Sequence, residues 1–248
     1  MHHAVLPQNT IKAFVVFCVF CVFRGFKIMK EEIFMYVGRI VAVGKSQDNK
    51  ITAMYRVSSR SFPNRQSKKI GEAIAIVPKE GFEQDIYKNP YISYNCLRLT
   101  GHYAIVANGT HTDPIAEKLT GGMSVRDAMI TVLHGMDYEH DSYNTPRITA
   151  VIDSAGQTGT LGIIRLDGIF VKTFELEAGE AYYVATYEHN YPSETFKDNN
   201  FHVDDADEAC DYILGKGAFA DLERPISAAC VIQEQDGFSI AFKDIESQ

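Results

Sequence analysis

Residues 147–174, RITAVIDSAGQTGTLGIIRLDGIFVKTF, decide the fold class of this chain. Three short runs rich in β-branched and aromatic residues lie in this stretch, at Arg147–Ile152, Gly159–Leu166 and Ile169–Phe174. Asp167-Gly168, between the last two runs, is a dipeptide typical of tight hairpin turns. The stretch therefore predicts consecutive antiparallel strands.

Similar runs occur on both sides of this stretch. The other predicted strands are Tyr36–Val43, Ile51–Val57, Glu72–Val77, Cys96–Thr100, Tyr103–Ala107, Ala181–Tyr187, Ile226–Ile232 and Phe238–Phe242. Helical spacing is confined to Pro114–Tyr138, which is interrupted at Gly121-Gly122 and restarted by Ser124, and to Asp204–Leu214. Strands in blocks with helices between the blocks favour an α+β layered sandwich over a doubly wound parallel sheet.

The composition excludes several classes of protein. The chain has 248 residues, with 24 Lys and Arg against 32 Asp and Glu, and its net charge of -8 does not suit general nucleic-acid binding. Five Cys without paired CxxC motifs predict neither a disulfide framework nor a structural zinc site. We therefore expect a reducing compartment, the cytoplasm.

Residues 1–34 do not match the rest of the chain. The apolar run Ala13–Phe23 is flanked by basic residues and is shorter than the roughly 20 residues of a membrane-spanning helix. No small-residue cleavage pattern follows it, which argues against a secretory signal. We interpret 1–34 as an atypical hydrophobic extension from a misassigned start, with Met29 or Met35 as later starts, and 35–248 as a single domain.

The segment Arg56–Arg65, RVSSRSFPNR, places three Arg and three Ser within ten residues of an acidic chain. Arginine forks and serine hydroxyls match the geometry of phosphate oxygens, so the segment indicates an anion site, with a solvated basic loop as the alternative. Pro63 favours a rigid turn within it.

Three later segments also carry polar residues next to strands. In Asn89–Cys96 a tyrosine, Tyr91 or Tyr94, is suited to proton transfer, although packing is the commoner role of such a residue. Asn108–Pro114 leads into a helix whose N-terminus suits an anion or a polarised carbonyl. His111 and Asp113 make half of a metal site, but no other His has the spacing to complete it, so no metal is predicted.

The third segment, Met136–Arg147, follows a helix and contains acids around Tyr138 and His140. Negative charge at a helix C-terminus is electrostatically unfavourable, because the helix dipole is negative there. This cost indicates a function for one or more of the acids, with solvation of a loop as the alternative.

The motifs taken in order resemble the archaeal-type IMP cyclohydrolase family. They are MYVGRIVAVG, YRVSSRSFPNR, NPYISYNCLR, ANGTHTDPIA, MDYEHDSYNTPRI and TYEH, and the resemblance covers residues 35–230. It implies an αββα sandwich of two antiparallel sheets, similar to the N-terminal nucleophile hydrolases. It also implies the last step of de novo purine synthesis, in which formylaminoimidazole carboxamide ribonucleotide (FAICAR) closes to inosine monophosphate (IMP) with loss of water, without metal or organic cofactor.

The resemblance also implies roles for residues. Arg65, Tyr94 and Glu139 are the expected catalytic group, and the expected contacts to the purine ribonucleotide are Arg56, Ser59, Arg60, Asn108, Thr110 and His111. Which of Tyr94 and Glu139 is the base stays open, as does the oligomeric state, with a homo-oligomer possible. Two alternatives are an amide hydrolase with a terminal Ser, Thr or Cys nucleophile, and a non-catalytic nucleotide-binding module. No nucleic-acid or membrane partner is expected.

Overall fold

The computed structural model describes residues 36–223 and 225–245. The predicted extension 1–34 lies outside the described residues, so its interpretation as a misassigned start stays a prediction. In the described part, no helix is both long and apolar enough to cross a membrane.

Two antiparallel sheets form the centre of the fold. Within the described residues, the six-stranded sheet has the order β11 (Lys197–Asp198), β10 (Glu180–Ala185), β1 (Ile40–Lys45), β2 (Ile51–Ser58), β12 (Pro225–Glu234), β13 (Gly237–Asp244). The seven-stranded sheet has the order β3 (Arg65–Ile70), β4 (Ala73–Pro78), β5 (Tyr94–Thr100), β6 (Tyr103–Ala107), β7 (Arg147–Asp153), β8 (Thr158–Arg165), β9 (Gly168–Glu175). The stretch 147–174 thus supplies three neighbouring strands, as predicted.

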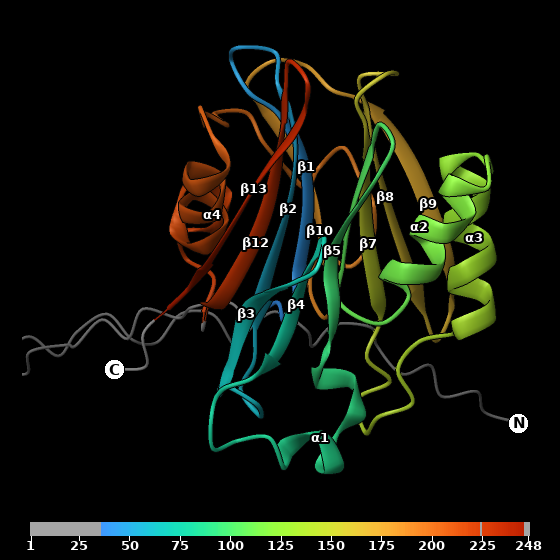
Figure 1. The fold of residues 1–248 in the computed structure, drawn as a ribbon, viewed down its shortest axis with the longest axis vertical. Helices are drawn as coiled ribbons and strands as arrows, with labels where there is room; N and C mark the ends of the chain where they lie inside the picture. Colours follow the sequence, from blue (N-terminus) through green and yellow to red (C-terminus); the bar gives the residue numbers. More distant parts are fainter. Residues whose placement is uncertain (1–35, 224, 246–248) are drawn as a thin grey trace, which may run out of the picture. The chain divides into compact units, whose positions relative to one another are not determined.

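Alternation along the strands produces four layers. In β1, Val41 and Val43 join the core between the two sheets, whereas Ile40 and Ala42 join the core under helix α4 (Ala206–Gly215). A third core lies between the seven-stranded sheet and helices α2 (Thr112–Thr120) and α3 (Val125–Met136). Figure 1 shows α4 outside one sheet and α2 and α3 outside the other, so the predicted αββα sandwich is confirmed.

Helices α3 and α4 begin where the sequence indicated, whereas α2 begins at Thr112, two residues before the predicted Pro114. Ser124 caps α3, because its hydroxyl accepts a hydrogen bond from the backbone N–H of Asp127. Asp205 caps α4 in the same way, accepting from the N–H of Glu208 at 2.8 Å. The chain also forms the short helix α1 (Asp85–Lys88) and two 3-10 turns, η1 (Pro90–Ile92) and η2 (Gly217–Phe219).

Two strands were not predicted. β3 is an edge strand that pairs only with β4, and its outer residues Lys68, Lys69 and Ile70 are exposed, so it lacks the alternating apolar pattern. β11 is only two residues long. Both lie at sheet edges, where burial imposes little pattern on the sequence.

Candidate active site

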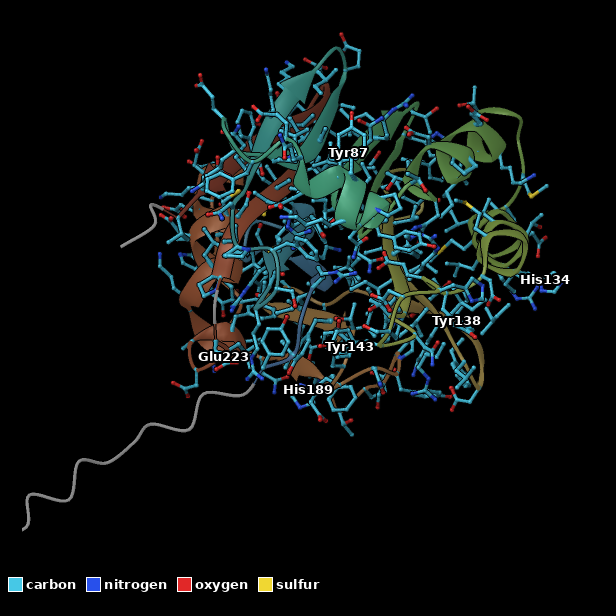
Figure 2. The ribbon with its side chains drawn as sticks, turned by 90° about the horizontal axis from the view of Figure 1, so that it is seen from below. Tyr87, His134, Tyr138, Tyr143, His189 and Glu223 are labelled. Atoms are coloured by element: carbon cyan, nitrogen blue, oxygen red, sulfur yellow. The ribbon has the colours of Figure 1, made fainter. Side chains whose placement is uncertain are left out.

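One end of the sandwich brings together segments that are far apart in the sequence. The starts of β1, β3, β5 and β7 and the ends of β2 and β10 lie at the end that carries α1, the lower end in Figure 1. Figure 2 looks onto this end and shows Tyr87, Tyr143, His189 and Glu223, which come from four different segments.

A cavity of about 490 Å³ lies at this end, within the size range of small-ligand sites. Its lining comprises Tyr36, Arg39, Ser59, Ser61, Phe62, Arg65, Lys88, Asn89, Pro90, Tyr91, Ile92, Glu139, His140, Asp141, Ser142, Tyr143 and Tyr187. The lining thus combines arginine and lysine with carboxylates and several tyrosines, a set able both to bind an anion and to move protons.

Arg39 and Glu139 form an ion pair in this lining. An Nη2 proton of Arg39 is donated to Oε2 of Glu139 at 2.9 Å, and the side chains are 11% and 1% exposed. Burial lowers the pKa of Arg39, but Glu139 and nearby tyrosines raise it more, so the guanidinium stays charged. Burial raises the pKa of Glu139 above its usual range, while Arg39 and Arg147 hold it down. Glu139 is therefore a buried carboxyl group whose pKa is raised by burial and held in check by two arginines.

Glycine at position 38 allows Arg39 to take this place. Gly38 has a φ of 76°, in the left-handed region, and a Cβ there would collide with the hydroxyl of Thr186 and the ring of Tyr187. The chain then enters β1 with the N–H of Arg39 donating to Thr186 Oγ1 at 3.1 Å.

The loop that carries Glu139 is held by Asp141. The carboxylate of Asp141 accepts from the N–H groups of Tyr143 and Thr145 and from the Thr145 hydroxyl, at 3.1, 3.0 and 2.7 Å. Glu139 itself pairs through its backbone with Thr145 in an isolated antiparallel bridge. The acids after α3 thus have distinct places, because Asp141 orders the loop and Glu139 faces the cavity.

Arg65 begins β3 and is 2% exposed. Its Nε donates to the carbonyl of Phe62 at 3.1 Å, which orients the guanidinium, and the residue lines the cavity with Glu139. A buried guanidinium beside a cavity is suited to stabilising negative charge on a ligand oxygen.

Tyr94 begins β5 and is not among the lining residues. It is 5% exposed, and its hydroxyl is 2.6 Å from the hydroxyl of Tyr55 on β2. Burial raises the pKa of Tyr94, whereas Arg65 and Arg39 lower it. The structure thus brings Arg65 and Glu139 together in the lining and leaves Tyr94 outside it, with Arg65 and Arg39 near enough to affect its pKa.

Arg56 lies away from the cavity. Alternation in β2 turns Tyr55 toward the core between the sheets and Arg56 toward α4. Its guanidinium nitrogens donate to Ser58 and to the carbonyls of Ile213, Leu214, Phe219, Leu222 and Glu223. The predicted ligand contact is corrected here, because the geometry gives Arg56 the structural task of satisfying carbonyls at the end of α4 and beyond it.

Three other predicted contact residues also lie outside the lining. Asn108 joins the backbone around β7, donating to the Pro146 carbonyl and accepting from the N–H of Ile148. Thr110 is exposed, and His111 is fully buried with Nε2 bonded to the Ile148 carbonyl at 3.0 Å. As placed in the structure, these residues do not contact the cavity.

Ser59 and Arg60 lie close to the predicted site. Ser59 lines the cavity and accepts a hydrogen bond from the N–H of Phe62. Arg60 is exposed, pairs with Glu223 and lies over the ring of Tyr36, beside a smaller hollow of about 240 Å³ that shares Tyr36 and Tyr187 with the cavity. The basic segment therefore divides, with Ser59 and Arg65 at the cavity and Arg60 at its margin.

Sequence reasoning missed Arg39, Tyr55 and Arg147. Arg39 lies directly before the apolar strand β1, and Arg147 is the first residue of the apolar strand β7. A charged residue at the end of an apolar strand is the one sequence feature that points to either of them. Tyr55 lies in the middle of a strand and has the pattern of an ordinary core residue.

The fold and the cavity define the chain as an αββα sandwich with an Arg–Glu pair and a second arginine around a small-ligand site. The chain belongs to the IMP cyclohydrolase-like protein family, whose model matches residues 36–237. It is 45% identical over 210 residues to an IMP cyclohydrolase of Methanosphaera stadtmanae, covering 85% of this chain and 100% of that protein. It is 43% identical over 214 residues to an IMP cyclohydrolase of Methanocaldococcus jannaschii, covering 84% and 99%.

Proposed function

We infer that this chain is an IMP cyclohydrolase, which closes FAICAR to IMP and water. The observation that carries the proposal is the buried carboxylate of Glu139, paired with Arg39 and facing a cavity that Arg65 also lines, in a chain of this family. The family resemblance predicted from the motifs is confirmed by the family model and by the relatives.

The reaction requires two proton transfers and one new carbon–nitrogen bond. The carboxamide nitrogen attacks the formyl carbon and loses a proton, and the formyl oxygen gains one to become a hydroxyl group. That hydroxyl group gains a second proton and leaves as water as its carbon–oxygen bond breaks, while the nitrogen that carried the formyl group loses its proton to form the ring double bond. Both reacting groups belong to one molecule, so holding it in a bent conformation removes much of the barrier.

We assign Glu139 as the base for the carboxamide N–H and Arg65 as the group that stabilises charge on the formyl oxygen. Glu139 suits this role because its pKa is raised by burial, which brings the carboxylate closer in basicity to its task. Arg65 suits its role because it is buried and lies in the same lining.

Tyr94 remains in the proposal as the acid that protonates the formyl oxygen. Burial raises the pKa of Tyr94 on balance, and the nearby guanidinium groups of Arg65 and Arg39 limit that rise, as an acid beside the cavity requires. Its hydroxyl also contacts that of Tyr55, which provides a second proton for the pair.

Binding of the ribonucleotide phosphate is proposed for three residues of the cavity lining, Ser59, Ser61 and Lys88. These side chains supply hydroxyl and ammonium donors suited to phosphate oxygens. The cytoplasmic location and a homo-oligomeric state stay predictions.

The test is incubation of the purified protein with FAICAR alone, followed by chromatographic identification of the product. IMP is the expected product. An amide hydrolase would instead release formate and leave the free amine, and a nucleotide-binding module would show thermal stabilisation without conversion. Either of those results would contradict the proposal.

A further inference from the structure

Beside Glu139 lies a row of buried polar atoms for which the described structure gives no hydrogen-bond partner. Besides Nε of Arg39, they are Oε1 of Glu139, Nη1 of Arg147 and Nδ1 of His111. Oε1 and Nη1 are 4.0 Å apart, which is longer than a hydrogen bond but within the range of strong charge interaction. Three such atoms close together are unusual, because buried polar groups are normally satisfied.

His111 is fixed in one tautomer by its surroundings. Its Nε2 lies 3.0 Å from the carbonyl of Ile148, and a carbonyl oxygen only accepts, so Nε2 carries the proton. Burial and the nearby Arg147 lower the pKa of His111 to about 3, so the ring is neutral near pH 7. Nδ1 is therefore a free acceptor.

Gly109 makes room for Arg147 and His111 to approach each other. A Cβ at this position would lie 2.7 Å from Nη1 of Arg147 and 3.1 Å from Nδ1 of His111. Both nitrogens thus border the same small space. The Nη1 group of Arg147 has two protons, so it can donate one toward Nδ1 of His111 and the other toward Oε1 of Glu139.

Arg147 is otherwise firmly held, and it is not in the cavity lining. Its side chain is 6% exposed, its Nε donates to the carbonyl of Asp137 at 2.8 Å, and its guanidinium lies over the ring of Tyr91 at 5.4 Å. A ligand in the cavity would meet Tyr91 and Glu139 before it met Arg147.

We propose that Arg147, supported by neutral His111, is a positioning residue that acts on the reaction through the carboxylate of Glu139. Arg39 binds Oε2 of this carboxylate, and Arg147, which lies outside the cavity lining, orients Oε1. This role rests on the proposed function, because it assigns a second support to the base of that reaction.

The charged and titratable groups around the carboxylate are few. Arg39 approaches Glu139 from β1, Arg147 from β7 and Asp141 from the same loop, while Asp137 and Tyr91 face Arg147. Loss of Arg147 removes a positive charge near Glu139, so the pKa of the carboxyl group rises and the base is ionised only at higher pH.

The test is the pH dependence of kcat and KM for Arg147→Met, Arg147→Lys and Gly109→Ala. In Arg147→Met we expect the acidic limb of kcat to move up by about one pH unit or more, with KM little changed. Arg147→Lys keeps the charge and should move the limb less. Gly109→Ala removes no charge but displaces Arg147, so the limb should move in the same direction as in Arg147→Met.

Arg126→Met is the matched control, because Arg126 is an exposed arginine paired with Asp127 on α3. Its pH profile should match that of the wild type. The proposal is overturned if Arg147→Met lowers kcat equally at all pH values, which indicates a purely structural role. It is also overturned if KM rises while kcat is unchanged, which indicates direct contact with substrate.

A measurement without turnover separates this inference from the proposed function. Carbon-13 labelling of the glutamate carboxyl groups, with Glu139→Gln to assign the signal, gives the pKa of Glu139 directly. A higher value in both Arg147→Met and Gly109→Ala than in the wild type supports the inference, even in a protein that does not convert FAICAR. Unchanged values in these variants would overturn it.

Discussion

Two arginines have opposite surroundings: Arg39, directly before β1, and Arg56, on the neighbouring strand β2. Arg56 faces α4 without a carboxylate and donates to five backbone carbonyls and one serine. Arg39 faces the cavity, pairs with Glu139 and has an Nε without a partner in the described structure. Burial lowers the pKa of Arg56 to about 10, whereas Glu139 raises that of Arg39 in spite of burial.

The difference separates an arginine whose hydrogen bonds all serve the fold from one that lines the cavity. Every N–H group of the Arg56 guanidinium donates a hydrogen bond within the protein, so none is left for a ligand. At the cavity, polar atoms remain unsatisfied and charges are paired across segments, which is typical of sites prepared for chemistry. Substitution of Arg56 should therefore lower the stability of the fold, whereas substitutions at the cavity should lower turnover.

The largest effect is expected from Arg56→Met, on stability. Five carbonyls lose their donor, so the free energy of unfolding should fall by about 3 kcal/mol. Urea unfolding measures the loss, and turnover per folded molecule should stay near that of the wild type. A variant that keeps its stability but loses turnover would restore Arg56 to the ligand site and break the comparison.

Next in size is Glu139→Gln, on turnover. Loss of the proposed base should lower kcat by roughly 10² or more, equivalent to about 2.7 kcal/mol in the barrier, while the circular dichroism spectrum stays native. Tyr94→Phe should lose a similar factor because it removes the proposed acid. Wild-type rates of IMP formation in both variants would contradict the site assignment.

An effect confined to acid pH concerns the stability contribution of His111. Its pKa is about 3 in the folded protein and near 6.5 when unfolded, so the unfolded state binds the proton first as the pH falls. Its contribution is thus fully present above pH 6.5 and is lost toward pH 3, at about 1.4 kcal/mol per pH unit.

We expect His111→Gln to lose less stability than the wild type between pH 6.5 and 4, measured by urea unfolding. His134→Gln is the control, because His134 is exposed on α3 and lies at the periphery in Figure 2. Parallel curves for wild type and His111→Gln would show that His111 titrates alike in both states.

The smallest effect is expected from Tyr55→Phe. The hydroxyl of Tyr94 loses its partner, but the proposed acid itself remains, so kcat should fall by about tenfold or less. Steady-state kinetics beside Tyr94→Phe measures the difference. An equal loss in the two variants would show that the two hydroxyl groups act as one unit.

Much of the fold was readable from the sequence because strand and helix patterns are local. The run 147–174 gave three strands with a turn at Asp167, and Ser124 marked the start of α3 through its cap. The edge strand β3 was missed because exposed Lys68 and Lys69 carry no apolar alternation.

The site was only partly readable. Unusual composition marked the segments 56–65 and 136–147, and the family resemblance selected Glu139, Arg65 and Ser59 within them; all three line one cavity. Arg39 and Arg147 were missed because a single arginine beside an apolar strand does not by itself indicate a functional site. Their significance comes from Glu139, which is 100 residues away from Arg39 in the chain.

By itself, the sequence determined the α+β layered class and the capped starts of α3 and α4, since these depend on neighbours along the chain, and its motifs determined the family. Only the tertiary structure decided that Arg56 faces away from the cavity while Arg39 and Arg147 flank Glu139. The physical reason is that burial and charge pairing act through space, so the side of the sheet that a residue faces outweighs its residue type.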